Sequence, residues 1–300
     1  MRESDLKKDY ADFTTENPFD FALRSSIGCG GVARLAFCPR SKGELISLLE
    51  RLNADGVGYR VLGNLTNILP PDGESKRAVV RLKHLQVVKE EQNGVYVSAG
   101  ATSGLLLRVC AAANLSGAEF LAGIPCTVGG ALFMNAGVSG RYIAEIVQSV
   151  RVLYQNKQQE LSFADCKYAY KTSVFMQDEF LILGASLRLT PATAGAVERE
   201  IKGYLQKRAH LPKGRSMGCV FKNPQPPEYP ENISAGKLIE GAGLKGMRVG
   251  GAFVSDTHAN FIINDRNATS EQIKRLIDII KNAVYVQYKI RLEEEIRYLD

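Results

Sequence analysis

Cysteine and histidine are too scattered in this sequence to form the common metal sites. The three histidines, His84, His210 and His258, lie far apart, and none of the six cysteines belongs to a CxxC pair. Structural zinc is held by closely spaced cysteine and histidine ligands, so we expect no metal site. Several of the cysteines lie in apolar stretches, which is typical of buried, reduced thiols rather than of disulfides.

Long hydrophobic runs are also missing. Residues 1–20 are polar and include four aspartates, so we do not expect them to form a secretory signal. Residues 120–140 contain no charge, but they include several glycines together with Pro125 and Asn135. Bent backbone and an asparagine are costly in lipid, so we expect a buried loop that binds a ligand instead of a membrane span. These observations favour a cytoplasmic protein.

Charge and composition are close to those of an ordinary globular protein. The 300 residues are 45% hydrophobic and 23% charged, and the formal net charge is +6. The length suggests about two domains. The small positive charge favours anionic ligands, but it is too small to indicate nucleic acid by itself.

The expected secondary structure mixes helices and strands. Strands are predicted at residues 35–38, 59–62, 78–80, 85–88, 95–98, 146–154 and 180–189, with a hairpin turn at Asn93-Gly94. Helices are predicted between Ser41 and the turn at Asp55-Gly56, and at residues 104–113, 197–208, 235–240 and 269–284. Because strands and helices are partly segregated along the chain, the fold class is α+β.

Capping residues mark the expected helix starts. Ser41 with Glu44, and Thr269 with Gln272, have the spacing of a capping box, in which each side chain satisfies a backbone N–H of the other residue. Ser103 is expected to cap the helix at residues 104–113.

Two glycine-containing segments are candidates for binding a ligand through the backbone. The first, Gly63-Asn64-Leu65-Thr66-Asn67, follows a strand, and its short residues would let consecutive N–H groups face an anion. An ordinary turn is the alternative. The second, residues 123–137, is long, uncharged and dense in glycine, so its backbone can approach a large flat ligand closely. A buried β-bulge region is the alternative here.

A basic run without any acid extends from residue 201 to residue 222. Such a run would suit a diphosphate, and a solvated basic face is the alternative. Its aromatic residues, Tyr204 and Phe221, do not give the interleaved pattern of a nucleic-acid site. The basic residues are Lys202, Lys207, Arg208, Lys213, Arg215 and Lys222.

Cys219 lies in a glycine-flanked turn of this basic run. Arg215 and Lys222 give it a polar, electropositive neighbourhood, unlike that of a structural cysteine, which is the alternative. The nucleophile of a thiol hydrolase would need a histidine partner, which the sequence does not place. Near the C-terminus, residues 293–295 are consecutive glutamates, for which a solvated face is the alternative to a role in a site.

Taken together and in this order, these segments resemble the UDP-N-acetylenolpyruvoylglucosamine reductase family. Residues 117–137 read GAEFLAGIPCTVGGALFMNAG and residues 218–224 read GCVFKNP, both similar to signature segments of that family. The other segments that carry the resemblance are residues 27–33, 63–67, 170–175, 235–240, 250–252, 258–261 and 292–297. The chain is similar to the shorter class of the family, which lacks an inserted substrate-capping loop.

The resemblance implies an FAD-binding fold of the vanillyl-alcohol-oxidase (PCMH) type with an added substrate domain. Residues 1–75 and 76–205 would form two FAD-binding subdomains. Residues 206–300 would form an α+β domain that binds a UDP-sugar, and its C-terminal strand would return to the active site.

The implied reaction reduces UDP-N-acetylglucosamine enolpyruvate to UDP-N-acetylmuramate, a precursor of peptidoglycan. NADPH reduces FAD, and the flavin passes a hydride to the methylene carbon of the enolpyruvyl ether while a protein acid protonates the adjacent carbon. Negative charge spreads into the substrate carboxylate, where a cation stabilises it. By position in the motifs, the resemblance makes Cys219 the proton donor, Lys171 the cation and Glu295 the carboxylate partner.

The resemblance also implies the binding residues and partners. The pyrophosphate of non-covalently bound FAD would lie near residues 63–67 and its ring near residues 123–137. The FAD residues would be Gly63, Asn64, Leu65, Thr66, Asn67, Ala122, Gly123, Ile124, Pro125, Thr127, Gly129, Gly130, Asn135, Ala136 and Gly137. The UDP-sugar residues would be Lys207, Arg208, Lys213, Lys222 and Asn223. We expect NADPH and the UDP-sugar as partners, no nucleic acid, no membrane span, and a monomer.

Two of the three implied catalytic residues depart from the family pattern, and residues 63–66 and Cys126 also differ from it. Cys219 replaces the usual serine, and Lys171 replaces the usual arginine. Lysine keeps the charge but loses the two-pronged grip of arginine on a carboxylate, and Arg248 is a candidate to assist it. The alternatives are an FAD-dependent sugar or alcohol oxidase of the same superfamily, and an inactive relative that only binds the UDP-sugar.

Overall fold

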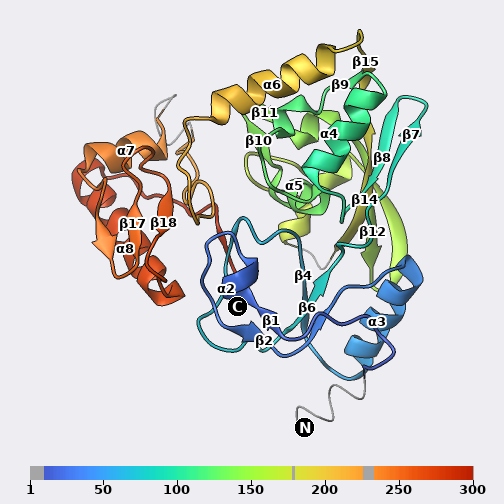
Figure 1. Ribbon diagram of the computed structural model, residues 1–300, viewed down its shortest axis with the longest axis horizontal. Coiled ribbons are helices and arrows are strands. Elements are labelled where there is room, and N and C mark those ends of the chain that lie inside the picture. The colour runs from blue at the N-terminus through green and yellow to red at the C-terminus, as the bar shows by residue number, and fades with distance from the viewer. Residues whose placement is uncertain (1–9, 178–179, 226–232, 300) are drawn as a thin grey trace. The chain divides into compact units, whose positions relative to one another are not determined.

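The chain forms two compact units, each assembled from separate stretches of sequence (Figure 1). The computed structural model describes residues 10–177, 180–225 and 233–299. The first unit consists of Met1–Asn17, Leu35–Asn64 and Arg77–Ala209. The second unit consists of Pro18–Arg34, Leu65–Lys76 and His210–Asp300.

A small parallel sheet lies in the first unit. Its strands, in the order β3-β6-β4, are β3 (Ala36–Phe37), β6 (Ala78–Arg81) and β4 (Tyr59–Leu62). The predicted helix between Ser41 and the turn at Asp55-Gly56 is α3 (Lys42–Ala54), which leads from β3 to β4. Its buried residues are Leu45, Leu48, Leu49 and Leu52.

The start of α3 differs in one respect from the expected capping box. Ser41 Oγ accepts the N–H of Glu44 at 3.1 Å, as predicted. The Glu44 carboxylate does not return a bond to Ser41 but accepts the N–H groups of Thr14 and Arg40, both at 2.7 Å. Burial alone would raise the pKa of Glu44, but these backbone hydrogen bonds outweigh it, and the pKa is lowered.

A five-stranded antiparallel sheet forms the larger part of the first unit (Figure 1). In the order β13-β12-β14-β8-β7, its strands are β13 (Lys157–Ser162), β12 (Val147–Tyr154), β14 (Leu181–Arg188), β8 (Gly94–Ser98) and β7 (Val88–Glu91). The hairpin predicted at Asn93-Gly94 is confirmed, since β7 pairs with β8.

The strand predicted at residues 85–88 is wrong over its first three residues, because β7 begins only at Val88. Ser98 Oγ donates to Leu85 O and accepts the N–H of Val87, both at 2.7 Å. A side chain therefore occupies the backbone groups that a strand ladder would have used.

The helices of the first unit follow the predicted pattern, with one shifted cap. α4 (Ser103–Ala112) begins one residue earlier than expected, because Thr102 Oγ1 accepts the N–H of Leu105 at 3.1 Å. Ser103 Oγ donates instead to Ile124 O at 2.6 Å. The helix predicted at residues 197–208 is α6 (Ala196–Arg208). The remaining elements are β9 (Leu115–Ser116), η1 (Glu119–Leu121), α5 (Val128–Met134), β10 (Gly137–Val138), β11 (Arg141–Tyr142), η2 (Ile143–Ile146), η3 (Ala164–Cys166), η4 (Val174–Met176) and β15 (Thr190–Pro191).

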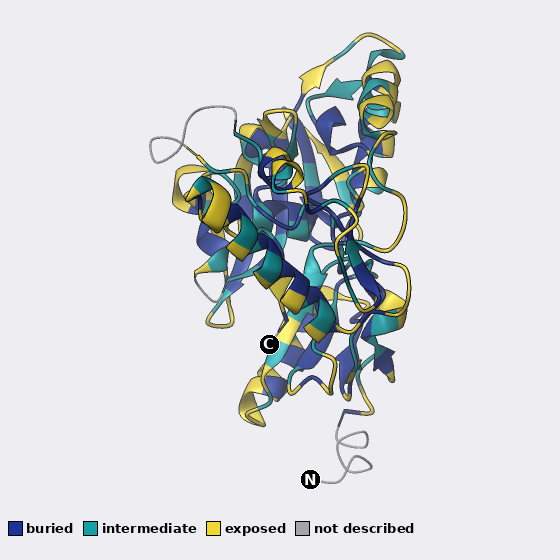
Figure 2. Ribbon diagram, turned by 90° about the vertical axis from the view of Figure 1, so that its left-hand side faces the viewer, coloured by how far each residue is buried: buried dark blue, intermediate teal, exposed yellow. Residues whose placement is uncertain are grey.

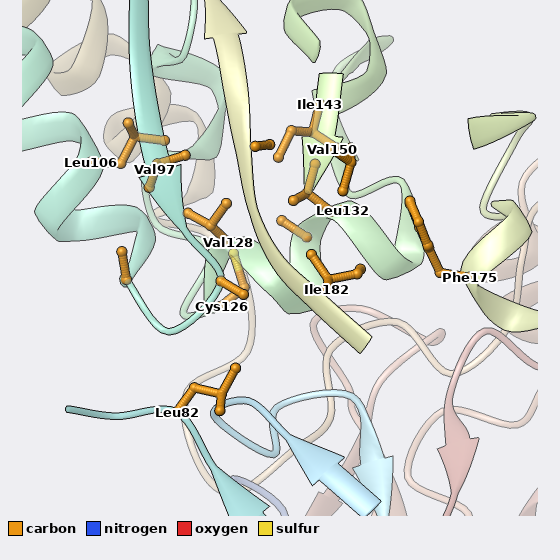
Figure 3. Packing of buried hydrophobic residues seen from close by; sticks show 14 of the residues in the cluster. Leu82, Val97, Leu106, Cys126, Val128, Leu132, Ile143, Val150, Phe175 and Ile182 are labelled. Atoms are coloured by element: carbon orange, nitrogen blue, oxygen red, sulfur yellow. The ribbon is translucent and has the colours of Figure 1, made fainter. Parts of the chain in front are cut away.

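One hydrophobic core holds α5 against the larger sheet. Figure 3 shows Val128 and Leu132 of α5 together with Val97 of β8, Val150 of β12 and Ile182 of β14, and all five side chains are buried. Burying such a side chain contributes about 1.5–3 kcal/mol, so these contacts fix the position of this short helix on the sheet.

The second unit contains a three-stranded antiparallel sheet and two principal helices. The strands, in sheet order, are β16 (Arg248–Val249), β17 (Ala252–Val254) and β18 (Ile262–Asn264), and the helices are α7 (Ala235–Gly241) and α8 (Ser270–Tyr288). The short elements are β1 (Phe19–Asp20), paired with β2 (Val32–Ala33), then α2 (Phe21–Arg24), and β5 (Ile68–Leu69), paired in parallel with β19 (Arg297–Tyr298).

The capping box predicted for α8 is confirmed. Thr269 Oγ1 accepts the N–H of Gln272 at 3.1 Å, and Gln272 Oε1 accepts the N–H of Thr269 at 3.3 Å. Figure 2 shows buried and exposed residues alternating along the helices. The buried apolar residues of α8 recur at helical spacing, namely Ile273, Leu276, Ile277, Ile280 and Val284.

Candidate active site

Two segments predicted to bind FAD lie against each other in the first unit. A Cβ atom on Gly63 would lie 2.5 Å from Thr127 Oγ1, so the approach requires glycine. Asn64 Nδ2 donates to Pro125 O at 3.1 Å. The first residues of the loop after β4 therefore pack directly on the stretch that precedes α5.

The glycine-dense segment is not the β-bulge region considered as an alternative. It contains an extended stretch followed by α5, which begins after Thr127 and ends at Asn135. The N–H groups of residues 128–130 donate to Ala101 O, Ala99 O and Thr127 Oγ1. Because these donors are used within the protein, the start of α5 is not an anion-binding group.

The loop after β4 has backbone N–H groups that no acceptor among the described residues uses. Within the described ranges, the N–H groups of residues 64–67 donate to no protein acceptor, whereas Leu65 O and Asn67 O accept the N–H groups of Ser26 and Arg297. Leu65 has a φ of 51°, which is uncommon for a bulky residue. Consecutive unused N–H groups are what a phosphate requires, so this loop fits the pyrophosphate of FAD.

Lys171 lies in a tight turn of the first unit. The N–H groups of Ala169 and Thr172 donate to each other's carbonyl oxygens at 3.2 and 3.1 Å, so Tyr170 and Lys171 form the turn between them. The φ of Lys171 is 53°, in the left-handed region.

Asn135, which we predicted as an FAD residue, uses its side chain within the protein. Its Nδ2 donates to Ala169 O at 2.8 Å and its Oδ1 accepts the N–H of Ala144 at 3.2 Å. Two residues on, a Cβ atom on Gly137 would lie 2.2 Å from Arg141 O, so this glycine is required by the β10–β11 pair. These contacts shape the chain after α5.

The segment that carries Cys219 is held between two other segments of the second unit. Cys219 forms an antiparallel bridge with Phe261, and Val220 O accepts the N–H of Glu295 at 2.7 Å. Asn67 Nδ2 donates to Glu295 O at 3.1 Å. Three segments that are distant in sequence, and that were singled out separately, are therefore neighbours here.

Asn260 contacts this segment but was not predicted from the sequence as a site residue. Its buried amide pairs with the backbone of Phe221, with Nδ2 donating to the carbonyl at 2.8 Å and Oδ1 accepting the N–H at 2.9 Å. The N–H of Asn260 donates to His258 Nδ1 at 3.3 Å, and burial lowers the pKa of that histidine. A polar residue between Ala259 and Phe261 was the available signal.

The basic run is divided between the two units, because the boundary between them falls after Ala209. Lys202, Lys207 and Arg208 belong to the first unit, and Lys213, Arg215 and Lys222 to the second. The run also has a counter-charge, contrary to its sequence pattern, since Lys222 Nζ lies 3.2 Å from Glu293 Oε2.

The residues predicted to bind the UDP-sugar differ in their surroundings. A Cβ atom on Gly123 would lie 3.1 Å from Arg208 Cδ, so Arg208 lies against a segment assigned to FAD. Lys213 is exposed. Asn223 Oδ1 accepts the N–H of Ala235 at 3.0 Å, at the start of α7. All five predicted residues, including Lys207 and Lys222, remain at least partly exposed.

Cys219 is the one cysteine that is not buried, and all six are free thiols. Burial raises the pKa of Cys126 to about 11 and that of Cys110 to about 12, so these two stay protonated. The expectation of buried, reduced cysteines is confirmed for the other five. Among the described residues, no group of three or more His, Cys, Asp or Glu residues is placed to hold a metal ion.

Arg248, the cation considered as an assistant to Lys171, is paired within the second unit. Its Nη1 and Nη2 donate to Asp265 Oδ1 and Oδ2 at 2.6 and 2.8 Å, and its guanidinium lies 4.6 Å from the ring centre of Phe253. The two-pronged pair raises the pKa of Arg248 and lowers that of Asp265.

Family models match both parts of the chain. A model described as "FAD binding domain" matches residues 33–158, and one described as "UDP-N-acetylenolpyruvoylglucosamine reductase, C-terminal domain" matches residues 209–299. The fold and the match define a flavoprotein with an FAD-binding domain followed by a second, C-terminal domain. The expected α+β FAD-binding fold and the FAD cofactor are thereby confirmed.

Named relatives are similar to this chain over most of its length. The UDP-N-acetylenolpyruvoylglucosamine reductase of Syntrophobacter fumaroxidans is 41% identical over 93% of this chain and 81% of its own length. The reductase of Caldicellulosiruptor bescii is 35% identical over 98% of this chain and 93% of its own length. The crystal structure of the Thermus caldophilus enzyme has a TM-score of 0.81 at 30% identity and covers 96% of this chain and 100% of its own. The chain belongs to the UDP-N-acetylenolpyruvoylglucosamine reductase family, as its sequence motifs indicated.

None of the described helices is both long enough and apolar enough to cross a bilayer.

Proposed function

We propose that this chain reduces UDP-N-acetylglucosamine enolpyruvate to UDP-N-acetylmuramate at the expense of NADPH, in the synthesis of a peptidoglycan precursor. The observation that carries the proposal is its match to relatives of that activity along almost the full length of both chains. FAD, when bound, supplies the hydride that it receives from NADPH. The substrate gains that hydride at its methylene carbon and a proton at the adjacent carbon, and NADP⁺ is released.

Cys219 is the proposed proton donor. Its side chain is partly exposed, and the backbone around it is fixed by Asn260 and by the N–H of Glu295. A thiol is mostly protonated near neutral pH and is a stronger acid than a serine hydroxyl, so the exchange of serine for cysteine keeps a competent donor.

Lys171 and Glu295 are the other proposed catalytic residues. Lys171 supplies positive charge for the substrate carboxylate, into which negative charge spreads as the hydride adds. Glu295 is the carboxylate partner, and its backbone is bonded to the residue that follows Cys219. Lys171 belongs to the first unit, whereas Cys219 and Glu295 belong to the second.

The diphosphate of the substrate is the proposed ligand of the basic side chains. Lys207, Arg208, Lys213 and Lys222 are at least partly exposed and can reach an anion. Asn223 accepts the N–H of Ala235 through Oδ1, which orients Nδ2 as a donor. A charge-assisted hydrogen bond contributes about 1.5–3 kcal/mol, so loss of the principal base would weaken substrate binding by about 10- to 100-fold.

Anaerobic turnover tests this proposal against the oxidase alternative. NADPH and the enolpyruvyl substrate are incubated with the purified protein, and the product is weighed by mass spectrometry. A product heavier by two hydrogen atoms, formed with one NADPH consumed per molecule, is expected. In a separate aerobic assay, oxygen consumption with sugars or alcohols, together with no anaerobic turnover of the enolpyruvyl substrate, would instead identify an oxidase.

We further propose that the protein is a cytoplasmic monomer without a nucleic-acid partner. The aromatic residues of the basic run, Tyr204 and Phe221, do not give the interleaved pattern of a nucleic-acid site, which supports the absence of such a partner. Light scattering on the purified holoprotein should give the mass of a single chain, and a doubled mass would overturn the monomer.

A further inference from the structure

The end of α5 holds the turn that carries Lys171. Asn135 lies immediately after the helix with a φ of 43°, and its Nδ2 donates to Ala169 O at 2.8 Å. Ser173 Oγ donates to Phe133 O, in the last turn of α5, at 2.7 Å. Asn135 and Ser173 are 4% and 2% exposed, so water does not compete for these bonds. Both ends of the turn at residues 169–172 are thus tied to one helix end.

The conformation of the turn explains why it needs such support. Lys171 is its third residue and has a φ of 53°. Turns with a positive φ at this position usually have glycine or asparagine there, because a side chain is strained in the left-handed region. A lysine keeps this conformation only where its surroundings fix it. The reciprocal bonds between Ala169 and Thr172 and the two side-chain bonds provide that constraint.

Asn135 is well suited to fix the turn, because both the nitrogen and the oxygen of its side-chain amide form hydrogen bonds. Its Oδ1 accepts the N–H of Ala144 at 3.2 Å, so rotation of the amide would break two bonds at once. Asparagine is also among the residues that tolerate the left-handed conformation after a helix. At the other end of α5, Thr127 lies against Gly63 of the loop that fits the FAD pyrophosphate. One short, partly buried helix therefore joins that loop to the Lys171 turn.

We propose that Asn135 and Ser173 are positioning residues that act through Lys171. They hold the Ala169–Thr172 turn in the conformation from which the lysine side chain meets the substrate carboxylate. This inference rests on the proposed function, in which Lys171 stabilises the charge that forms on that carboxylate. It also changes the role of Asn135 from the FAD contact suggested by the sequence to a support of the turn.

Two variants remove the bonds separately. Asn135→Gly keeps a residue that accepts a positive φ but removes both amide bonds, and Ser173→Ala removes the hydroxyl bond. In each variant, the rate at which the enolpyruvyl substrate reoxidises the reduced flavin should fall by about 10- to 100-fold, because small misplacements of a catalytic group are costly. Flavin reduction by NADPH should be unchanged, since Lys171 has no part in it.

Asn114→Gly is the matched control. Asn114 follows α4 with a φ of 53°, and within the described ranges its side chain forms no hydrogen bond. The same replacement at the same backbone conformation should therefore leave both half-reactions at the wild-type rates.

A double-mutant cycle separates positioning from a general structural role. If Asn135 acts through Lys171, adding Asn135→Gly to Lys171→Ala should cause no further loss of reoxidation rate. A loss that multiplies the two single effects would contradict the inference. Hydrogen exchange gives a readout independent of catalysis, and the N–H groups of Ala169 and Thr172 should exchange faster in Asn135→Gly than in Asn114→Gly.

The outcomes distinguish this inference from the function on which it rests. If the flavin of Lys171→Ala is reoxidised at the wild-type rate, Lys171 does not have the proposed role, and its positioning residues have none either. If Lys171→Ala is reoxidised slowly while Asn135→Gly and Ser173→Ala keep the wild-type rates and the wild-type hydrogen exchange, the inference is wrong and the proposed function stands.

Discussion

Cys219 is the proposed proton donor, and it is the one cysteine of this chain with a partly exposed side chain. We expect Cys219→Ala to be reduced by NADPH at the wild-type rate, because that half-reaction needs no protein acid. Reoxidation by the enolpyruvyl substrate should slow by about 10²-fold or more, the usual contribution of a general acid. Rapid-mixing absorbance measurements resolve the two half-reactions.

Cys219→Ser is the matched variant for this prediction. It keeps a proton donor of similar size, so it should retain much of the activity and, unlike the wild type, resist inactivation by thiol alkylation. Reoxidation of Cys219→Ala at the wild-type rate would make Cys219 a structural cysteine.

His258 should make stability depend on pH. Burial lowers its pKa, and its Nδ1 accepts the N–H of Asn260, so the folded protein holds the neutral form. The unfolded chain takes up a proton near the reference pKa of about 6.5, above the folded value. The contribution of His258 is therefore complete above about pH 6.5 and is lost as the pH falls through the lowered pKa.

The test is chemical unfolding at a series of pH values. His258→Asn places an amide oxygen where Nδ1 stood, so it should keep the acceptor and flatten the pH dependence of the unfolding free energy. If the wild-type and variant curves run parallel below neutral pH, His258 is not the titrating group.

At the residue scale, the sequence did not predict what several of the singled-out side chains contact. Cys219 and Glu295 were both singled out, and their backbones are neighbours. The pairing of Lys222 with Glu293 and the internal use of the Asn135 amide were not foreseen. Both depend on partners that only the folded chain brings close, and no local pattern encodes them.

Among the secondary-structure elements, α5 depends on a close approach that can be tested. Gly63 has no room for a Cβ atom because Thr127 Oγ1, which caps α5 by accepting the N–H of Gly130 at 3.2 Å, lies 2.5 Å from where it would stand. In Gly63→Ala, either the cap or the loop must move. We expect the dissociation constant of FAD to rise by about 5- to 30-fold, equivalent to the loss of about 1–2 kcal/mol for a cap.

Gly203→Ala is the control for this change, since a Cβ atom at that position of α6 would meet nothing within 4 Å. Fluorescence titration of the apoprotein with FAD measures both variants. Equal dissociation constants for Gly63→Ala and the wild type would show that the approach of these loops does not matter for the flavin.

Elements with strong local signals were predicted well, and those set by distant partners were not. The capping box of α8 is a local pattern, and it is confirmed. The start of β7 depends on Ser98, whose hydroxyl takes the backbone groups of residues 85 and 87. α5 was missed because a seven-residue helix with two glycines has little helical signal, and its packing on the sheet decides its conformation.

At the scale of the whole molecule, the second unit depends on two segments that come early in the chain. Asn264 Nδ2 donates to the carbonyl oxygens of Ile27 and Gly28, at 2.9 and 3.1 Å. Asp72 accepts the N–H groups of Ser270 and Glu271, at 2.6 and 2.9 Å, at the start of α8. β5 supplies the partner of β19.

A fragment of residues 209–300 should therefore not fold by itself. It would lack the acceptors for Asn264, the Asp72 carboxylate that accepts two N–H groups at the start of α8, and the partner of β19, so its buried polar groups would be unsatisfied. Circular dichroism during urea titration should show no cooperative transition for the fragment, in contrast to the full chain. A cooperative transition with native helix content would show that the second unit is independent.

The account as a whole is tested most directly by following the transferred atoms. NADPH carrying deuterium at its transferable position is mixed anaerobically with the holoprotein, and UDP-N-acetylglucosamine enolpyruvate is then added. We expect the flavin absorbance to bleach and return. With all solutions in D₂O, so that exchange of the flavin N5 hydrogen with solvent cannot remove the label, we expect the product to carry one deuterium on the former methylene carbon and one on the adjacent carbon. A flavin that stays reduced with this substrate but is reoxidised by oxygen would contradict the account.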